Sequence, residues 1–271
     1  MTKTHFILST AGHVDHGKTA LIKALTDIDC DTHREEKERG ITINLGFAHI
    51  NLSEEKSIGI VDVPGHKDFV STMVAGASST DIALLVVAAD SGIMPQTEEH
   101  LQIMQLMGIK RGFVAITRTD LADPELIEIV QAEIDSLVAG TFLEKAPVVK
   151  TSAKTGEGIE KMKDVISTLI DKCEQNQSNG IFRLYIDRIF SVKGYGTVIN
   201  GSAKEGILKN SDTIYLLPHT KKLRIRRMER FGREVKTVFP GDRTSINIVG
   251  LDKNEFNPGM LISTRKLHSS V

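Results

Sequence analysis

The stretch AGHVDHGKTA, residues 11–20, holds two glycines five positions apart, and Lys18 and Thr19 follow the second of them. An apolar run at 6–9 precedes this stretch, and residues 18–25 are expected to form a helix. A glycine-rich loop between a strand and a helix is the setting of a phosphate-binding loop, because glycines let backbone N–H groups turn toward phosphate oxygens. The start of the helix adds positive potential. The sequence therefore predicts a nucleotide-binding α/β domain.

The residues of this loop have separate expected roles. Lys18 should reach the β and γ phosphates, and the Thr19 hydroxyl should bind Mg²⁺. The other expected nucleotide-binding residues of the loop are Val14, Asp15, His16, Gly17 and Ala20. A carboxylate at Asp15, inside a loop that holds phosphate, is not explained by the motif.

A second motif, DVPGH at 62–66, follows an apolar run. Asp62 suits a carboxylate that faces Mg²⁺ through water, and Gly65 can bring its N–H close to a γ-phosphate because it lacks a side chain. His66 then stands where a water-positioning catalytic residue is needed. The alternative is a histidine at a helix start with no chemistry.

Thr42, in the segment RGITI, is the third expected magnesium ligand. A threonine in a charged loop can join the ion's ligands when the γ-phosphate is present, which makes the loop an order–disorder switch. The charged run at 34–40 is equally compatible with a solvated helix, and a solvated segment that folds over nucleotide satisfies both interpretations.

Two further segments, ITRTD at 116–120 and TSAKTG at 151–156, are expected to recognise the base. Asp120 can accept two hydrogen bonds from guanine, which adenine cannot offer, and the Ala153 N–H can donate to the guanine oxygen. The usual pattern begins Asn-Lys, whereas Thr117 and Arg118 stand here. We therefore expect guanine specificity with a weaker connection between loops, and the Arg118 stem over the purine. The other expected contacts are Ser152 and Lys154.

The chain changes character near residue 180. Up to 174, short apolar runs alternate with amphipathic segments, which predicts a mostly parallel sheet covered on both faces by helices. Strands are expected at 6–9, 41–52, 58–63, 82–88, 113–117 and 148–151, and helices at 18–25, 67–77, 96–107, 126–138 and 159–173. A polar linker at 175–180 follows, and residues 181–271 read as a small all-β barrel.

Charge is divided between the two parts. Residues 181–271 hold 17 Lys and Arg against 8 Asp and Glu, a net charge of +9, whereas residues 1–180 hold 17 against 27, a net charge of −10. A basic second part indicates a polyanionic partner or an ordinary charged surface. The two cysteines, Cys30 and Cys173, have no paired spacing, and the longest apolar run, at 82–89, is too short to cross a bilayer. We expect a cytoplasmic protein without a membrane partner.

The motifs GHVDHGKT, RGITI, DVPGH and SAKTGEG, followed by a β-rich part, resemble those of the translational GTPases related to elongation factor Tu. The segment REEKERGITINLGFA, the threonine at position 117 and the segment IDRIFSVKGYGTVINGS at 186–202 are similar to the selenocysteine-specific branch of that family. The resemblance covers residues 5–264. It implies a P-loop GTPase domain joined to a β-barrel, with GTP or GDP and Mg²⁺ as ligands.

The resemblance also assigns roles inside the phosphate-binding loop. It implies that Asp15 helps to hold a monovalent cation beside the β–γ bridge, which would explain the carboxylate. It implies that Val14 and Ile41 form an apolar gate beside His66. For His16 we expect a backbone N–H to phosphate and otherwise a structural role.

In the second part the resemblance implies a pocket for the aminoacyl end of tRNA, with Asp187, Arg188 and Arg243 at matching positions. Cations would favour a selenol, which is ionised at neutral pH. The alternative is a surface ion pair between Asp187 and Arg188. In the run KKLRIRR at 221–227, alternation puts Lys222, Arg224 and Arg226 on one strand face, either against tRNA or in solvent.

The leading hypothesis is thus a GTP-hydrolysing elongation factor that delivers selenocysteinyl-tRNA to the ribosome. Alternatives are the GTPase subunit of a non-translational enzyme such as one for sulfate activation, another aminoacyl- or initiator-tRNA carrier, and a module that sequesters its ligands. Members of the family continue into a further barrel, and bacterial ones add a region for an mRNA hairpin. We expect mRNA recognition only through such a region, which lies outside this sequence.

Overall fold

The computed structural model describes residues 4–30, 42, 44–53, 56–77, 79–173, 180–192, 196–230, 232–249, 255–257 and 259–267. The chain divides into two compact units, Met1–Cys173 and Glu174–Val271, and each is described by itself. The charged run at 34–40, Ile41 and the expected linker up to residue 179 lie outside the described residues. Within the described part, no helix is both long enough and apolar enough to span a bilayer.

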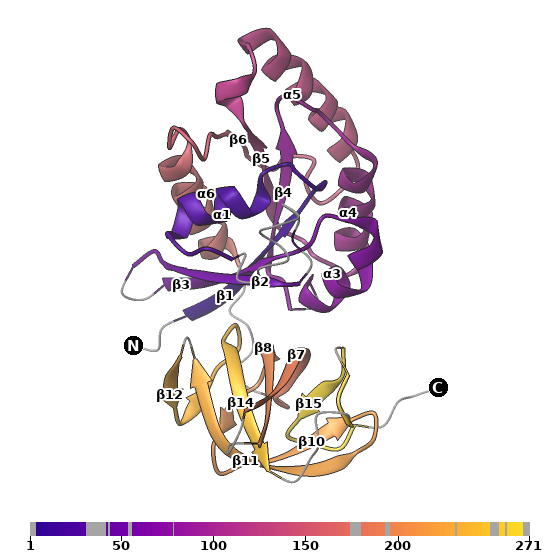
Figure 1. Ribbon diagram of the computed structural model, residues 1–271, viewed down its shortest axis with the longest axis vertical. Coiled ribbons are helices and arrows are strands. Elements are labelled where there is room, and N and C mark those ends of the chain that lie inside the picture. Colours follow the sequence, from indigo (N-terminus) through magenta and orange to yellow (C-terminus); the bar gives the residue numbers. More distant parts are fainter. Residues whose placement is uncertain are drawn as a thin grey trace. The chain divides into compact units, whose positions relative to one another are not determined.

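The first unit is a six-stranded sheet in the order β2-β3-β1-β4-β5-β6 (Figure 1). β2 and β3 are antiparallel, and every other pairing is parallel. The bounds of the strands are β1 Thr4–Ala11, β2 Gly46–Asn51, β3 Lys56–Asp62, β4 Ile82–Ala88, β5 Gly112–Thr117 and β6 Val148–Lys150. The predicted, mostly parallel α/β sheet is confirmed.

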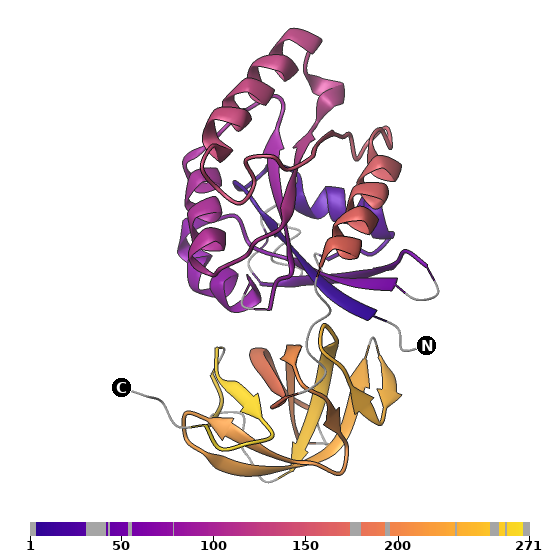
Figure 2. The same ribbon diagram turned by 180° about the vertical axis from the view of Figure 1, so that it is seen from behind.

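Helices cover both faces of this sheet, as Figures 1 and 2 show. One face packs against α1 and α6, and the other against α3, α4 and α5. Every residue of β4 is buried, which is why its sequence is apolar without alternation. The helices are α1 Lys18–Thr26, α3 Val70–Ala77, α4 Pro95–Leu106, α5 Pro124–Val138 and α6 Ile159–Lys172, with short 3₁₀ turns η1 Lys67–Phe69 and η2 Thr119–Leu121.

Two expected elements differ from the structure. The strand expected at 41–52 begins only at Gly46, because β2 finds its partner in β3 from the Gly46–Asp62 pair onward. The helix expected at 67–77 opens as the separate turn η1, with His66 as its N-cap, before α3 begins at Val70. His66 is therefore positioned by the short turn η1, where its ring accepts from the Asp68 N–H, and not by the first turn of a continuous helix.

The second unit is an antiparallel barrel. Its main sheet runs β10-β15-β7-β8-β14-β11-β12, and an additional β10–β11 pairing closes the ring. On β11, Leu223, Ile225 and Met228 are buried, and a register shift between Ile225 and Arg227 moves the inward position by one residue. The strands are β7 Arg183–Val192, β8 Gly196–Glu205, β9 Leu208–Lys209, β10 Thr213–Leu217, β11 Lys221–Arg230, β12 Arg233–Val235, β13 Thr237–Val238, β14 Arg243–Val249 and β15 Leu261–Ser263.

Candidate nucleotide site

The loop between β1 and α1 is held in a shape that needs its two glycines. Gly12 has φ of 131° and lies so close to β4 that a Cβ would stand 2.2 Å from the Val86 oxygen. Gly17 is the N-cap of α1 with φ of 77°, and no side chain caps the helix. The first N–H groups of α1 are thus available to an anion at the place where the motif expects phosphate.

Lys18 is 6% exposed, and its ammonium is held at the mouth of the loop. Its Nζ donates to the Gly12 oxygen at 3.0 Å and to the His13 oxygen at 2.7 Å. Burial lowers the pKa of Lys18 to about 8, while Asp62 and Asp15 act in the opposite direction. A phosphate oxygen would find this cation already aimed by two backbone carbonyls.

The three expected magnesium ligands come together. The Thr19 hydroxyl donates to Asp62 Oδ2 at 2.6 Å and lies 3.0 Å from the Thr42 hydroxyl. Asp62 is fully buried, and its other oxygen accepts from the Thr10 hydroxyl at 2.8 Å. Thr10 in turn accepts from the Val63 N–H at 3.0 Å, so β1 fixes the end of β3.

This donor set fits Mg²⁺. It offers two hydroxyls and one carboxylate, all oxygen, and Mg²⁺ characteristically uses one or two carboxylates together with waters and substrate phosphates. The described residues contain no group of three or more His, Cys, Asp or Glu that would form an all-protein metal cage. The site thus suits an ion that arrives with a nucleotide.

The DVPGH segment touches the phosphate-binding loop directly. A Cβ on Gly65 would lie 2.5 Å from Lys18 Nζ and 2.6 Å from the Val14 nitrogen, so only glycine fits. The His66 ring accepts from the Asp68 N–H at 3.3 Å, stands 5.9 Å from the Phe69 ring and remains 34% exposed. Val14 is half-buried, while Ile41, its expected gate partner, lies outside the described residues.

The two expected base-recognition loops are joined to each other. Asp120 Oδ1 accepts from the Ser152 hydroxyl at 2.6 Å, and Ser152 is buried. The Ser152 oxygen also accepts from the Thr155 N–H at 3.2 Å, which shapes the turn after β6. Ala153 and Lys154 are exposed at this turn. The carboxylate is therefore oriented before any base binds.

Thr117 and Arg118 connect these loops to the phosphate-binding loop. The Thr117 hydroxyl donates to the His16 oxygen at 2.7 Å. The Arg118 guanidinium donates to the Asp15 oxygen and, at 3.1 Å, to Asp90. Although the motif carries Thr-Arg in place of Asn-Lys, the connection between loops is present. The guanidinium points to Asp15 and Asp90, and the stem's place over a purine stays a prediction.

Two residues of α4 support the loop and were missed in the sequence. His100 Nδ1 accepts from the Gly12 N–H at 3.0 Å, and Gln96 accepts from the Val14 N–H at 3.1 Å. His100 is 1% exposed, and burial lowers its pKa to about 4. The sequence did offer a sign of this role, because His100 stands beside Leu101 on the apolar face of a predicted helix. A polar side chain that is buried there needs a hydrogen-bond partner.

His13 and His16 line the loop itself. Their rings lie 5.2 Å apart, and His16 Nδ1 is 3.4 Å from the Val86 oxygen. Burial lowers the pKa of His16 to about 4, so its ring is neutral at physiological pH. Asp15 is exposed with φ of 62°, and its proposed cation contact stays a prediction.

In the second unit, two of the three expected pocket residues form an ion pair. Arg243 Nη1 and Nη2 donate to the two Asp187 oxygens at 2.5 and 2.9 Å, and the side chains are 10% and 6% exposed. Asp187 lies at a register shift between Ile186 and Arg188. The Asp187 carboxylate is thus nearly buried and paired with Arg243 of β14, two strands away in the sheet, whereas the alternative was a surface pair with Arg188.

These features define a P-loop nucleotide-binding domain followed by a β-barrel. The family model "Elongation factor Tu GTP binding domain" matches residues 3–172, and "Elongation factor Tu domain 2" matches residues 196–263. The chain belongs to the elongation factor Tu family of GTP-binding proteins, which confirms the resemblance.

Particular relatives are selenocysteine-specific elongation factors. That of Desulfomicrobium baculatum is 46% identical over 95% of this chain and 40% of its own length, and that of Escherichia coli is 39% identical over 93% and 41%. The crystal structure of a bacterial selenocysteine-specific elongation factor matches with a TM-score of 0.91 and 40% identity, over 96% of this chain and 44% of that one.

An archaeal structure matches as well. It is elongation factor SelB from Methanococcus maripaludis in complex with the GTP analogue GppNHp, with a TM-score of 0.87 and 32% identity, over 98% of this chain and 56% of that one. The chain thus spans about two fifths of the length of the curated bacterial relatives. The sulfate-activation alternative finds no support among these proteins.

Proposed function

We propose that this chain binds GTP with Mg²⁺, hydrolyses it, and acts as part of a factor that delivers selenocysteinyl-tRNA to the ribosome. The observation that carries the proposal is the convergence of Thr19, Thr42 and Asp62 beside the buried ammonium of Lys18. The ammonium complements the negative phosphates of a nucleoside triphosphate, and the three oxygen donors complement its metal ion. The relatives named above supply the translational context.

Each residue would contribute a distinct step. Lys18 and the open N–H groups at the start of α1 would stabilise charge on the phosphates, and the Gly65 N–H would add a donor to the γ-phosphate. His66, on its short turn, orients the attacking water. Bound Mg²⁺ would supply charge neutralisation at the phosphate oxygens. Asp15 would hold a monovalent cation near the same phosphates.

The guanine assignment is tested by Asp120→Asn. The variant amide presents a donor where guanine also offers donors, so preference should move from GTP toward XTP by a factor of about 10³ or more. Competitive binding of the two nucleotides in magnesium buffer measures this shift. Glu125→Gln, on the nearby start of α5, is the matched control. A variant still selective for GTP would remove the base assignment.

For the second unit we propose that Arg243 and Arg188 favour a selenolate at the aminoacyl end of tRNA. Asp187 holds the Arg243 guanidinium by two hydrogen bonds, which orients it without leaving an unpaired buried charge. An ionised selenol gains more from such cations than a neutral hydroxyl. Action on the ribosome places the function in the cytoplasm, and we assign mRNA recognition to no described residue.

The aminoacyl proposal is tested with a GTP analogue that is not hydrolysed. Selenocysteinyl-tRNA should bind more tightly than cysteinyl-tRNA, and cysteinyl-tRNA more tightly than seryl-tRNA, at neutral pH. Arg188→Gln should reduce this ranking, whereas Arg233→Gln, an exposed arginine of the same barrel, should not. Equal affinity for the three charged tRNAs would contradict the proposal and leave the GTP assignment intact.

A further inference from the structure

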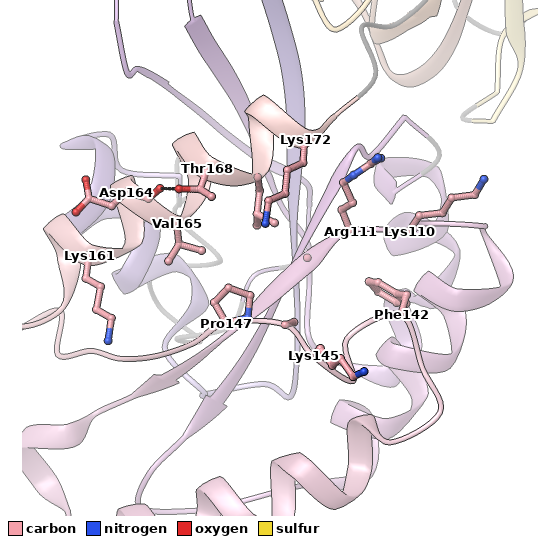
Figure 3. A pocket seen from close by; sticks show the side chains of 13 residues that line it. Lys110, Arg111, Phe142, Lys145, Pro147, Lys161, Asp164, Val165, Thr168 and Lys172 are labelled. Carbon is pink, nitrogen blue, oxygen red and sulfur yellow. Dashed lines mark hydrogen bonds between the residues drawn. The ribbon is translucent and has the colours of Figure 1, made fainter.

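A second pocket lies in the first unit, away from the nucleotide site. Its volume is about 540 Å³, within the range of small-molecule sites. It is bounded by α6, by the start of β5 and by the segment that leads into β6 (Figure 3). Figure 3 shows the α6 side chains on one side, Pro147 in the middle, and Lys145 and Phe142 on the other.

This pocket lies where β5 and β6 begin, whereas the phosphate-binding loop lies where β1 ends, so the two sites are at opposite ends of the parallel strands. Lys110 and Arg111 come immediately before β5, and Pro147 comes immediately before β6. The residues of the base-recognition loops follow the carboxyl ends of the same two strands. Because a strand rises about 3.3 Å per residue, the six residues of β5 separate the two sites by about 20 Å.

The pocket lining is strongly cationic. The lining includes one carboxylate, that of Asp164, and five cationic side chains, those of Lys110, Arg111, Lys145, Lys161 and Lys172. Among the described residues, none of the five has a side-chain hydrogen bond or ion pair. Such a concentration is notable in a part of the chain where acidic residues outnumber basic ones by 27 to 17.

Neighbouring carboxylates do not neutralise this lining. Glu160 pairs with Lys163 at 2.6 Å, and Asp171 pairs with Lys56 on β3. Glu144 accepts from the Gly140 N–H at 3.2 Å, within its own turn. The acidic groups that stand closest in the sequence are thus engaged elsewhere, which leaves the pocket with net positive charge.

The base of the pocket is apolar. Leu169 is 8% exposed and packs in the core, and Phe142 and Val165 are half-buried at its border. An inorganic anion would use the cations alone and leave this apolar surface in water. A ligand with a ring and a phosphate would use both, since the ring removes apolar surface from water while the ammonium groups bind the phosphate.

We propose that this pocket binds a nucleotide phosphate, with the base or sugar over Phe142, Pro147 and Val165 and the phosphates at the cationic rim. The ligand is either a nucleotide of an RNA strand or a free nucleotide, since both present the same chemistry. The inference is independent of the proposed function, because none of these residues belongs to the GTP site.

The test uses the full chain with saturating GDP and Mg²⁺, so that the first site is occupied. A fluorescein-labelled hexauridylate and ATP are titrated separately at low salt. Binding of the hexauridylate but not of ATP identifies RNA as the source, and binding of ATP identifies a free nucleotide. Either result supports the site if the variants below respond, and binding of neither probe overturns it.

The variants separate the pocket from general electrostatics. The triple variant Lys145→Gln, Lys161→Gln, Lys172→Gln should raise the dissociation constant at least about tenfold and reduce its salt dependence, because fewer counterions are released. The control triple variant Lys23→Gln, Lys150→Gln, Lys163→Gln removes equal charge from the same unit. It should change the dissociation constant less than about twofold. Asp164→Asn should tighten binding.

Two outcomes of the variant measurements would also overturn the proposal. One is an equal loss of affinity in both triple variants, which would indicate non-specific attraction. The other is unchanged affinity in the pocket variant. GTP affinity, measured in parallel, should be the same in all of these proteins, so failure of this site and failure of the GTP site are distinguishable.

Discussion

At the scale of single residues, buried histidines support the phosphate-binding loop. His100 accepts from the Gly12 N–H, and only an imidazole with an unprotonated Nδ1 can do so. Burial is the largest cause that lowers the pKa values of His100 and His16 to about 4. The hydrogen bond to the Gly12 N–H therefore depends on a neutral His100 ring.

This arrangement predicts acid sensitivity. An unfolded histidine takes up its proton near pH 6.5, whereas His100 does so only near pH 4, so the unfolded state binds more protons between these values and stability falls as pH falls. Between pH 7 and pH 5 each such group removes about 2 kcal/mol from the free energy of unfolding.

His100→Gln keeps an acceptor for the Gly12 N–H and cannot titrate. We expect its free energy of unfolding to fall about 2 kcal/mol less than that of the unmodified protein between pH 7 and pH 5. Urea denaturation at both pH values measures the difference, and the exposed His219→Gln is the control. If the stability of His100→Gln and that of the unmodified protein depended on pH in the same way, the role of His100 in acid sensitivity would be contradicted.

His66 carries a different kind of prediction, because its ring is partly exposed and contacts Asp68 and Phe69 of its own turn. His66→Ala should leave affinity for a GTP analogue within about threefold and slow ribosome-stimulated hydrolysis at least about 100-fold, the usual effect of losing a proton-transfer or water-positioning group. Single-turnover hydrolysis measures this, and unchanged turnover would count against the role.

At the scale of elements, hydrogen bonds between loops assemble the site. The Thr117 hydroxyl at the end of β5 reaches the His16 oxygen beside α1, across 101 residues of sequence. The Thr10 hydroxyl of β1 reaches Asp62 at the end of β3. Neighbouring parallel strands end at the same edge, so side chains from separate loops can contact one another there.

Thr117→Val tests this connection because valine has nearly the same shape and lacks the hydroxyl. The His16 carbonyl would lose its donor, which should reduce stability by about 1–3 kcal/mol and GTP affinity about tenfold. Thr117→Asn should retain affinity. Thr141→Val, which removes a hydroxyl that donates to the Val138 oxygen at 2.7 Å, should not alter affinity. Equal effects of both valine variants on GTP binding would refute the connection.

At the scale of the molecule, each unit has its own core. The sheet of the first unit is packed on both faces by separate apolar clusters, and the barrel of the second encloses another that contains Phe182, Ile246 and Ile262. All predicted nucleotide-site residues belong to the first unit, and the Asp187–Arg243 pair belongs to the second.

A fragment of residues 1–173 should therefore fold and bind GTP with an affinity within about threefold of that of the full chain, since no nucleotide-site residue is removed. Binding of aminoacyl-tRNA should be lost. Calorimetric titration of the fragment and the full chain with GTP provides the comparison. Loss of GTP binding in a folded fragment would show that the barrel contributes to the site.

Much of the first unit could be predicted from the chain because its signals are local. The phosphate-binding loop, the DVPGH motif and the apolar run of β4 are each read within ten residues, and their spacing reflects steric needs such as those of Gly12 and Gly65. The inward residues of β11 follow from alternation until the register shift after Ile225, which periodicity does not reveal.

The remaining features depend on which distant segments become neighbours. His100 meets Gly12 across 88 residues, Arg243 meets Asp187 across 56, and the cationic pocket draws on three separate segments. Such contacts are set by the order of the strands and the placement of the helices, which bring polar groups from distant segments together so that few stay unpaired when buried. Because the partners are far apart in the sequence, these contacts leave no local pattern in it. Composition and motif spacing were thus sufficient to predict the kind of site, whereas its supporting bonds emerged only from the packing of the folded chain.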